Sequence, residues 1–177
     1  MRLIIAGPRD FSPESLAIQD VKNGIWAWHQ KYNHKIDEII SGHSGVIDLA
    51  GESVAKEMNV KLKLFPYPND SDLRNWGMDP TKISIRARGP VRNGVMADYA
   101  KEVPPGGLLV VRDLGPNGVR LTRGTDSMKQ QALARGLLVM DYSPMDAVIG
   151  YKACWKKFPG KGNCRMPEKH KGDCAPY

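Results

Sequence analysis

The first eleven residues, MRLIIAGPRDF, place the strongest constraint on what this chain can fold into. Arg2–Ala6 is a short, mostly apolar run with the length and β-branched content of a buried parallel strand. Gly7–Pro8 ends this run with a turn signal, and Ser12–Pro13 then begins a helix as an N-cap followed by a first-turn proline. Arg9 and Asp10 are left at the carboxyl end of the strand, where open α/β sheets bind their ligands.

Strand-like and helix-like segments alternate along the chain as far as about Tyr142. Further strands are predicted at Lys35–Ser41, Val60–Pro66, Leu108–Arg112 and Leu137–Met140. Helices are predicted from Ser12 to Tyr32, from Val46 to Met58, from Gly89 to about Val103 and from Met128 to Arg135. This alternation predicts an α/β fold, a Rossmann-like three-layer sandwich with a mainly parallel five-stranded sheet.

The composition of the strands and of the segments between them adds detail. Leu108–Arg112 is the most hydrophobic strand and is expected in the centre of the sheet, beside the first strand. Val60–Pro66 alternates apolar and basic residues, which is typical of a half-exposed strand near an edge. Tyr67–Arg88 is predicted to be a long irregular lid or binding loop, in which Trp76 either stacks on a base or anchors the loop. Asp113–Arg123 resembles a small hairpin or a flexible loop.

Apolar spacing in the first two helices predicts their buried faces. In the second helix the expected buried stripe is Leu49, Ala50, Val54, Ala55 and Met58. In the first helix Trp26 and Trp28 fall on different faces, so we expect one in the core and the other half exposed or at a dimer contact.

The turns before four helices have the chemistry of a ligand site. These turns are Gly7–Ser12, Gly42–Gly45, Gly89–Asn93 and Gly124–Ser127. Glycine lets a ligand approach the backbone closely, and the free amides at a helix start favour phosphate. The candidate ligand-binding residues are Gly7, Arg9, Asp10, Gly42, His43, Ser44, Gly45, Asp48, Arg92, Asn93, Gly124 and Thr125.

Some of these side chains have two interpretations. His43 is a hydrogen-bonding or acid/base group, or a polar surface residue, which is the interpretation we favour. Asp48 binds a ribose hydroxyl, or lies at the helix start because the dipole favours an acid there. Arg92 and Asn93 are expected in a first helical turn, where they would hold an anion or a ribose. The sequence has no GxGxxG fingerprint, Walker A motif or GxSxG elbow, which argues against ordinary dehydrogenases, NTPases and α/β-hydrolases.

Four short motifs in register, GPRDF, SGHSGVIDLAGESVAKE, GPVRNGVMADYA and RGTDSMKQQALARGL, resemble the YspA-like branch of the SLOG superfamily. This Rossmann-like group joins the Smf/DprA proteins with the LOG enzymes, and the resemblance covers Met1 to about Tyr142. It implies a nucleotide or nucleotide-derived ligand, often bound in a dimer, that the protein senses, sequesters or processes. We therefore expect a homodimer or a higher homo-oligomer.

One departure from the family leaves the question of enzymatic activity open. The LOG phosphoribohydrolases carry PGGxGTxxE with a catalytic glutamate, and this chain has Met128 at that place. Hydrolysis of an N-glycosidic bond would then need another acid or nucleophile, for which Asp10, Asp48, Glu52 and Asp126 are candidates by location. Two alternatives therefore stand beside a ligand sensor: a nucleotide-processing hydrolase, and a DprA-like nucleic-acid-binding protein.

The last part of the chain differs in composition from the rest, so we expect a domain at 1–149 and a separate tail at 150–177. Cys154, Cys164, His170 and Cys174 have the spacing C-x9-C-x5-H-x3-C, which suits a closed structural zinc site of the zinc-knuckle type. The alternative is three free thiols and a surface histidine. Lys152–Lys171 holds seven basic residues against one acid, so the tail is either a solvated surface or a contact for nucleic acid.

The compartment and the remaining partners follow from what the sequence does not contain. No apolar stretch approaches the span of a bilayer, and the N-terminus lacks the apolar core of a signal peptide. Three cysteines do not make an even disulfide framework. We therefore expect a cytoplasmic protein with no membrane partner and no redox cofactor.

Overall fold

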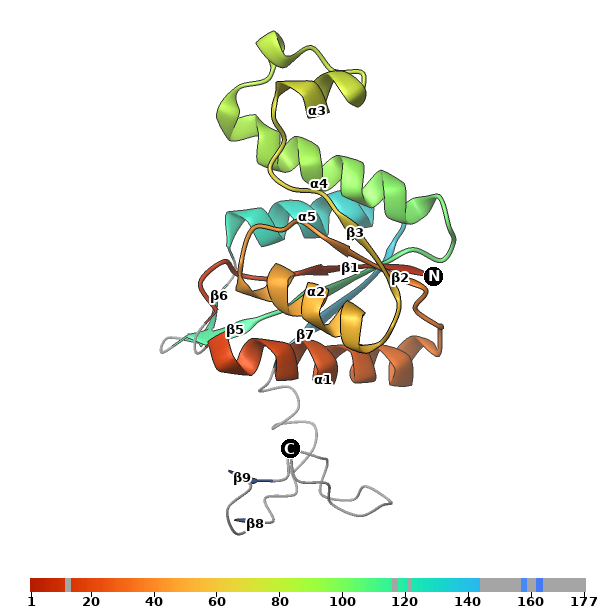
Figure 1. Cartoon of the computed structure of the whole chain (residues 1–177), viewed down its shortest axis with the longest axis vertical. Helices are drawn as coiled ribbons and strands as arrows, with labels where there is room; N and C mark the ends of the chain where they lie inside the picture. The colour runs from red at the N-terminus through yellow and green to blue at the C-terminus, as the bar shows by residue number, and fades with distance from the viewer. Residues whose placement is uncertain (12–13, 116–117, 121, 144–156, 159–161, 164–177) are drawn as a thin grey trace. The chain divides into compact units, whose positions relative to one another are not determined.

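The computed structural model describes residues 1–11, 14–115, 118–120, 122–143, 157–158 and 162–163 (Figure 1). The chain divides into two compact units, Met1–Tyr142 and Ser143–Tyr177. In the second unit the described residues are Ser143 and two short antiparallel strands, β8 (Lys157–Phe158) and β9 (Gly162–Asn163). The predicted boundary between residues 149 and 150 lies outside the described residues.

The first unit is built on a five-stranded sheet in which all neighbouring strands are parallel. Its strands are β1 (Arg2–Ala6), β2 (Glu38–Ser41), β3 (Lys61–Leu64), β4 (Gly107–Val111) and β7 (Leu138–Tyr142). The strand order is β3-β2-β1-β4-β7, so β4 lies beside β1 and β3 lies at an edge, as predicted. This arrangement confirms the predicted α/β class and is consistent with a Rossmann-like fold.

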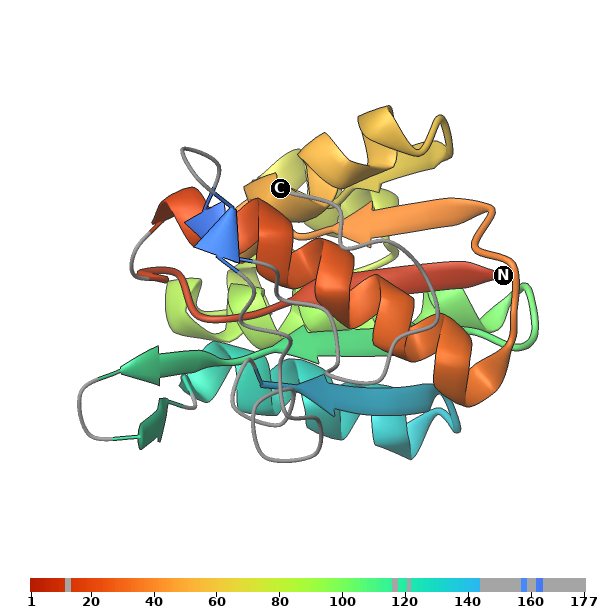
Figure 2. The same cartoon turned by 90° about the horizontal axis from the view of Figure 1, so that it is seen from below.

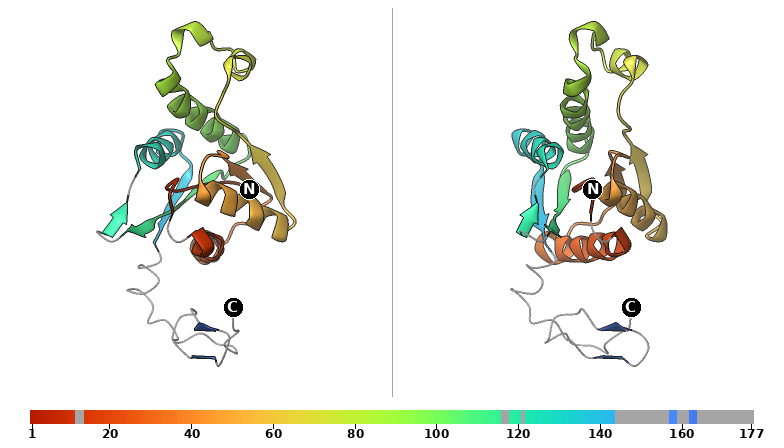
Figure 3. Two further views of the ribbon diagram at one scale, coloured as in Figure 1. Left: turned by 60° about the vertical axis from the view of Figure 1, so that its left-hand side comes forward. Right: turned by 90° about the vertical axis from the view of Figure 1, so that its left-hand side faces the viewer.

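Helices cover both faces of the sheet. α1 (Glu14–Tyr32) and α2 (Val46–Glu57) pack on one face, with α1 lying across the strands (Figure 2). α4 (Ile85–Lys101) and α5 (Arg123–Ala134) pack on the other (Figure 3). Among the described helices, none combines the length and the apolar character that a membrane span requires.

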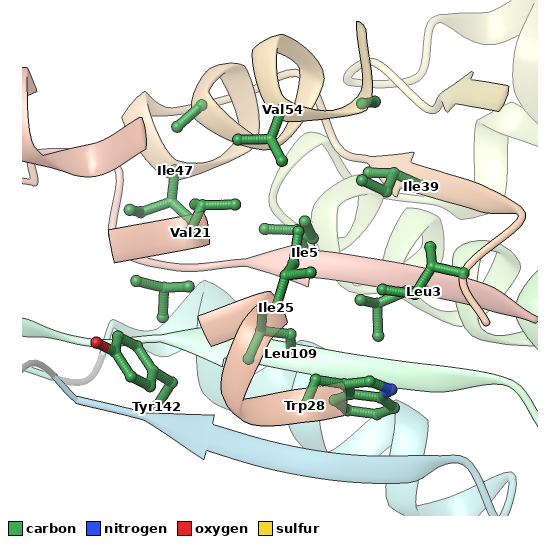
Figure 4. Close-up of a cluster of buried hydrophobic side chains, with 14 of the residues drawn as sticks. Leu3, Ile5, Val21, Ile25, Trp28, Ile39, Ile47, Val54, Leu109 and Tyr142 are labelled. Carbon is green, nitrogen blue, oxygen red and sulfur yellow. The ribbon is translucent and has the colours of Figure 1, made fainter. Parts of the chain in front are cut away.

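Each face of the sheet carries its own buried cluster, which explains why the strands are apolar at successive positions. Leu3, Ile5 and Leu109 face α1 and α2 and belong to the same buried cluster as Trp28 (Figure 4). Ile4, with the other alternate residues of the strands, faces α4 and α5. Trp28 is fully buried and the side chain of Trp26 is 45% exposed, which confirms the predicted difference between them.

The stretch predicted as a long loop is more ordered than expected. It contains α3 (Asp70–Asn75), which lies at the far end of α4 from the sheet (Figure 1), and the 3₁₀-helix η1 (Pro80–Lys82). A reciprocal capping box between Asn69 and Asp72 begins α3, a local signal that the loop interpretation overlooked. Trp76 is partly buried against the core, as expected of a loop anchor.

The predicted start of the fourth helix at Gly89 is wrong. α4 begins at Ile85, where the side chain of Ser84 caps it, and Pro90 lies inside the helix. The sequence pattern places Pro90 in a first turn because helices tolerate proline best there. The turn Gly89–Asn93 is therefore not a helix start, and its free amides are not present.

Two other helix predictions also need correction. Leu49 and Met58 are 49% and 38% exposed, whereas Asp48 and Glu52 lie on the buried face of α2. α5 begins at Arg123 instead of Met128, with Thr122 as its N-cap. The predicted hairpin is confirmed: it is formed by the antiparallel strands β5 (Asp113–Gly115) and β6 (Gly118–Arg120).

Gly107 at the start of β4 provides a test of the packing. A Cβ atom there would lie 2.5 Å from the buried ring of Trp28 and 2.9 Å from Cε of Met1. We expect Gly107→Ala to lower the free energy of unfolding by about 1–3 kcal/mol, because the ring has no room to move. Urea denaturation measures the change.

The matched control is Gly94→Ala in the middle of α4. A Cβ atom there would meet only the far ends of the flexible side chains of Arg135 and Gln131, at 3.2 and 3.4 Å. We expect no loss of stability, because alanine favours a helix by up to about 1 kcal/mol over glycine. Equal losses in the two variants would contradict the packing described for Gly107.

Candidate functional site

A pocket opens at the carboxyl ends of β1 and β2, between the beginnings of α2 and α5 and the middle of α4. It encloses about 430 Å³ of space, part of which is open to solvent. Residues from the sequence-based set that line it are Gly7, Arg9, Gly42, Ser44, Asp48, Arg92, Asn93, Gly124 and Thr125. Lining residues that the sequence did not indicate are Ile5, Ala6, Met96, Thr122 and Met128. Asp10, His43 and Gly45 belong to the predicted set but are not among the lining residues.

Two glycines allow close packing around the turn after β1, Gly7 against α2 and β4, and Gly45 against Arg9. A Cβ atom on Gly7 would lie 2.6 Å from Cγ1 of Ile47 and 2.7 Å from the carbonyl oxygen of Val111. A Cβ atom on Gly45, the N-cap of α2, would lie 2.7 Å from Cα of Arg9. The amide of Val46 donates to the carbonyl oxygen of Arg9 at 3.1 Å. Gly45 therefore does not line the pocket but helps to position the backbone of Arg9, which does.

Asp48 is the acidic group of the pocket. It is 7% exposed, and its Oδ2 accepts hydrogen bonds from the amide of Ser44 at 3.0 Å and from Oγ of Ser44 at 2.9 Å. Burial raises the pKa of Asp48, although the Ser44 hydrogen bonds and the charge of Arg92 act in the opposite direction. No group among the described residues donates to its Oδ1.

Arg92 is the buried cation of the pocket, and it is 8% exposed. Its Nη1 donates to the carbonyl oxygen of Gly42 at 2.8 Å, and its Nη2 donates to Oδ1 of Asn93 at 3.4 Å. Its Nε is buried and has no acceptor among the described residues. Burial lowers the pKa of Arg92, the carboxylate of Asp48 opposes that shift, and the charge of Arg9 adds to it. Arg92 reaches the pocket from the middle of α4, not from a helix start as predicted.

The beginning of α5 forms another wall. Thr122 caps this helix, and its Oγ1 lies 2.8 Å from Oγ1 of Thr125. The side-chain amide of Asn93 donates to the carbonyl oxygen of Gly124 at 3.2 Å and so ties α4 to α5. In the described part of the chain, the backbone amides of Arg123 and Gly124 have no acceptor. They form the positive end of the helix, which attracts anions.

His43 is held on the flank of α2, beside the pocket. Its Nδ1 lies 3.0 and 3.2 Å from the two carboxylate oxygens of Glu52, which also accepts a hydrogen bond from Oγ of Ser41 at 2.7 Å. The histidine side chain is 48% exposed and its backbone has a positive φ of 49°. His43 is thus a half-exposed residue with a fixed partner, and nothing local in the sequence indicated its pairing with Glu52.

The pocket therefore combines two arginines, the amides of a helix start and one buried carboxylate. This chemistry suits a polar ligand that carries both a negative charge and hydrogen-bond donors. Within the described ranges, no group of three or more His, Cys, Asp or Glu side chains is arranged to hold a metal ion. The predicted ligands Cys154, Cys164, His170 and Cys174 lie outside these ranges.

Comparison of the chain with protein-family models and with curated proteins finds no match in either set. The geometry of the pocket and the sequence motifs are therefore the basis for a functional proposal.

The raised pKa of Asp48 predicts how stability depends on pH. Because folding raises the pKa above its ordinary value of 3.8, ionised Asp48 destabilises the folded state at neutral pH. We expect Asp48→Asn to raise the Tm at pH 7 by roughly 2–4 °C, the shift that about 1 kcal/mol produces in a protein of this size. The gain should shrink as the pH falls through the raised pKa towards 3.8, because the wild-type carboxyl then becomes protonated.

Calorimetry between pH 3 and pH 8 measures this difference. Glu57→Gln, an exposed acid-to-amide change on the same helix, is the matched control and should change the Tm little. If Asp48→Asn gave the same gain at pH 3 and at pH 7, the stabilisation would not come from removing a buried charge.

Proposed function

We propose that the α/β domain binds a nucleotide or nucleotide-derived small molecule in this pocket, as a sensor or sequestering protein. The observation that carries the proposal is the meeting of Arg9, Arg92 and the beginning of α5, from which Thr122, Gly124 and Thr125 line the same cavity at the carboxyl edge of the sheet. Ligands of open α/β sheets bind at this edge.

The distribution of charge supports an anionic group on the ligand. Arg9 is exposed at the mouth of the pocket, whereas Arg92 lies at its buried end. A phosphate beside the amides of α5 would receive hydrogen bonds from the backbone and a favourable interaction with the helix dipole. The charge of Arg9 would attract the same group from solvent.

The resemblance to the YspA-like branch of the SLOG superfamily supports the same ligand class. We propose membership of that group from the four motifs. GPRDF, SGHSGVIDLAGESVAKE and RGTDSMKQQALARGL contribute to this pocket at a turn after a strand or at a helix start. The remaining motif, GPVRNGVMADYA, contributes from within α4. Its pocket residues Arg92 and Asn93 are held by hydrogen bonds to the other walls.

Binding without turnover fits the pocket better than hydrolysis. Met128, at the place of the LOG glutamate, is buried and lines the pocket, so an apolar side chain stands where those enzymes have a carboxylate. Among the described lining residues Asp48 is the only acid, and Ser44 already binds one of its oxygens. A nucleotide hydrolase is the alternative, and of the four candidate acids named from the sequence, Asp48 is the one that lines the pocket.

A binding experiment with Arg9→Ala tests the proposal. We expect wild-type protein to bind at least one nucleoside 5′-monophosphate in isothermal titration calorimetry, and Arg9→Ala to weaken that affinity about tenfold by removing a charge-assisted hydrogen bond. Arg86→Ala is the matched control, because Arg86 is exposed on α4 and does not line the pocket.

Chromatography of the same mixtures after incubation separates the two functions. Unchanged nucleotide supports a sensor, whereas free base or ribose phosphate supports the hydrolase. If no nucleotide binds, or if Arg9→Ala and Arg86→Ala lose affinity equally, the pocket is not the nucleotide site.

For the tail, we propose a structural zinc site that rests on the sequence alone. Cys154, Cys164, His170 and Cys174 are four ligands of the types that hold closed zinc sites, which would let a short tail fold. We expect protein purified without chelator to contain about one zinc ion per chain, and the His170→Asn variant to lose that zinc ion. The control variant His34→Asn, changed outside the tail, should retain the zinc ion. Native mass spectrometry measures the metal and also tests the proposed homo-oligomer, and zinc-free wild-type protein would contradict the site.

A further inference from the structure

We infer that the pocket selects its ligand by a sugar hydroxyl group, which Asp48 and Arg92 bind together. The inference rests on the proposed nucleotide function and specifies the ligand as one with a ribose and not a dideoxyribose sugar. It follows from the way in which the two side chains converge and from the hydrogen-bonding groups that each leaves without a partner.

Asp48 and Arg92 meet beside the backbone of Gly42. A Cβ atom built on Gly42 would lie 3.0 Å from Oδ2 of Asp48 and 3.1 Å from both Cζ and Nη2 of Arg92. The two charged groups do not bond each other: Oδ2 binds Ser44, and Nη1 binds the carbonyl oxygen of Gly42. Glycine at position 42 therefore leaves a carboxylate and a guanidinium side by side in the wall of the pocket.

Each of the two groups retains hydrogen-bonding capacity after its contacts within the protein are counted. Asp48 is 7% exposed and its Oδ1 accepts from no described residue. Arg92 is 8% exposed, its Nε has no acceptor in the described ranges, and the contact of its Nη2 with Asn93 is long at 3.4 Å. The buried Nε of Arg92 costs free energy while it lacks an acceptor, and Oδ1 of Asp48 has capacity to accept, so a ligand that pairs both groups gains affinity.

A hydroxyl group satisfies this combination better than the other groups of a nucleotide. It donates to the carboxylate and accepts from the guanidinium at the same time, and a vicinal pair of hydroxyls does so twice. An amino group of a base only donates, and a carbonyl oxygen only accepts. A phosphate beside Asp48 would face a like charge.

The phosphate has another wall of the pocket available. The free amides belong to the beginning of α5, whereas Asp48 belongs to α2, and these helices cover opposite faces of the sheet (Figure 3). The sugar can therefore lie against α2 and α4 while the phosphate lies at α5. This placement agrees with one of the two interpretations that the sequence left open for Asp48.

The test compares the four ribonucleoside 5′-monophosphates with their 2′,3′-dideoxy counterparts by isothermal titration calorimetry on the full-length protein. For any base that binds, we expect the ribonucleotide to bind about tenfold or more tightly than the dideoxynucleotide, the usual effect of a hydrogen bond to a charged group. In Asp48→Asn the difference should fall below about threefold, because an amide accepts more weakly than a carboxylate. Glu57→Gln should retain the full difference.

Each result has a distinct meaning. Equal affinities of ribo- and dideoxynucleotides for the wild-type protein would overturn the inference and leave the proposed nucleotide site intact. A ribose preference that persists in folded Asp48→Asn would remove Asp48 from the recognition. If inosine monophosphate fails to bind where adenosine monophosphate binds, and ribo- and dideoxynucleotides bind equally, a base amine lies at Asp48 instead of the sugar.

If no nucleotide binds, both the proposed function and the inference fail. The wild-type comparison needs no variant, so it holds whether or not Asp48→Asn folds.

Discussion

The parallel direction of all five strands is the constraint on which the rest of the molecule depends. Both faces of β1 and β4 are buried, by α1 and α2 on one side and by α4 and α5 on the other. Because each connection returns the chain to the same edge, the turns after β1 and β2 open at the same end of the sheet. Close packing of Gly45 against Arg9 then brings these turns into contact.

The pocket includes polar groups that do not favour the stability of the fold. Burial raises the pKa of Asp48 and lowers that of Arg92, so each charge costs free energy where it lies. The neighbouring groups compensate in part, through the Ser44 hydrogen bonds to Asp48 and the contact of Arg92 with the carbonyl oxygen of Gly42. Such costs are typical of sites arranged to bind a ligand rather than to hold the core together.

Much of the fold could be predicted from local patterns. Arg2–Ala6 was predicted with the bounds that the structure has, because a short apolar, β-branched run that stops at a Gly-Pro turn allows few alternatives. Helix starts were less certain, since a proline such as Pro90 fits both a first turn and, at some cost, a helix interior. The exposure of Leu49 was also mispredicted. Apolar spacing alone cannot show that the polar residues Asp48 and Glu52 lie on the buried face of α2.

The sequence by itself determined the α/β alternation, the central position of β4 and most of the residues that line the pocket. These features depend on apolar runs, on glycines and on residues next to one another in the chain. Only the tertiary structure decided that Arg92 enters the pocket from the middle of α4 and that Glu52 holds His43. It also decided that Asp48 and Arg92 converge on Gly42. These contacts join segments that are distant in the chain or lie on different elements, and packing of the whole sheet sets their distances and their burial, for which no local pattern gives a signal.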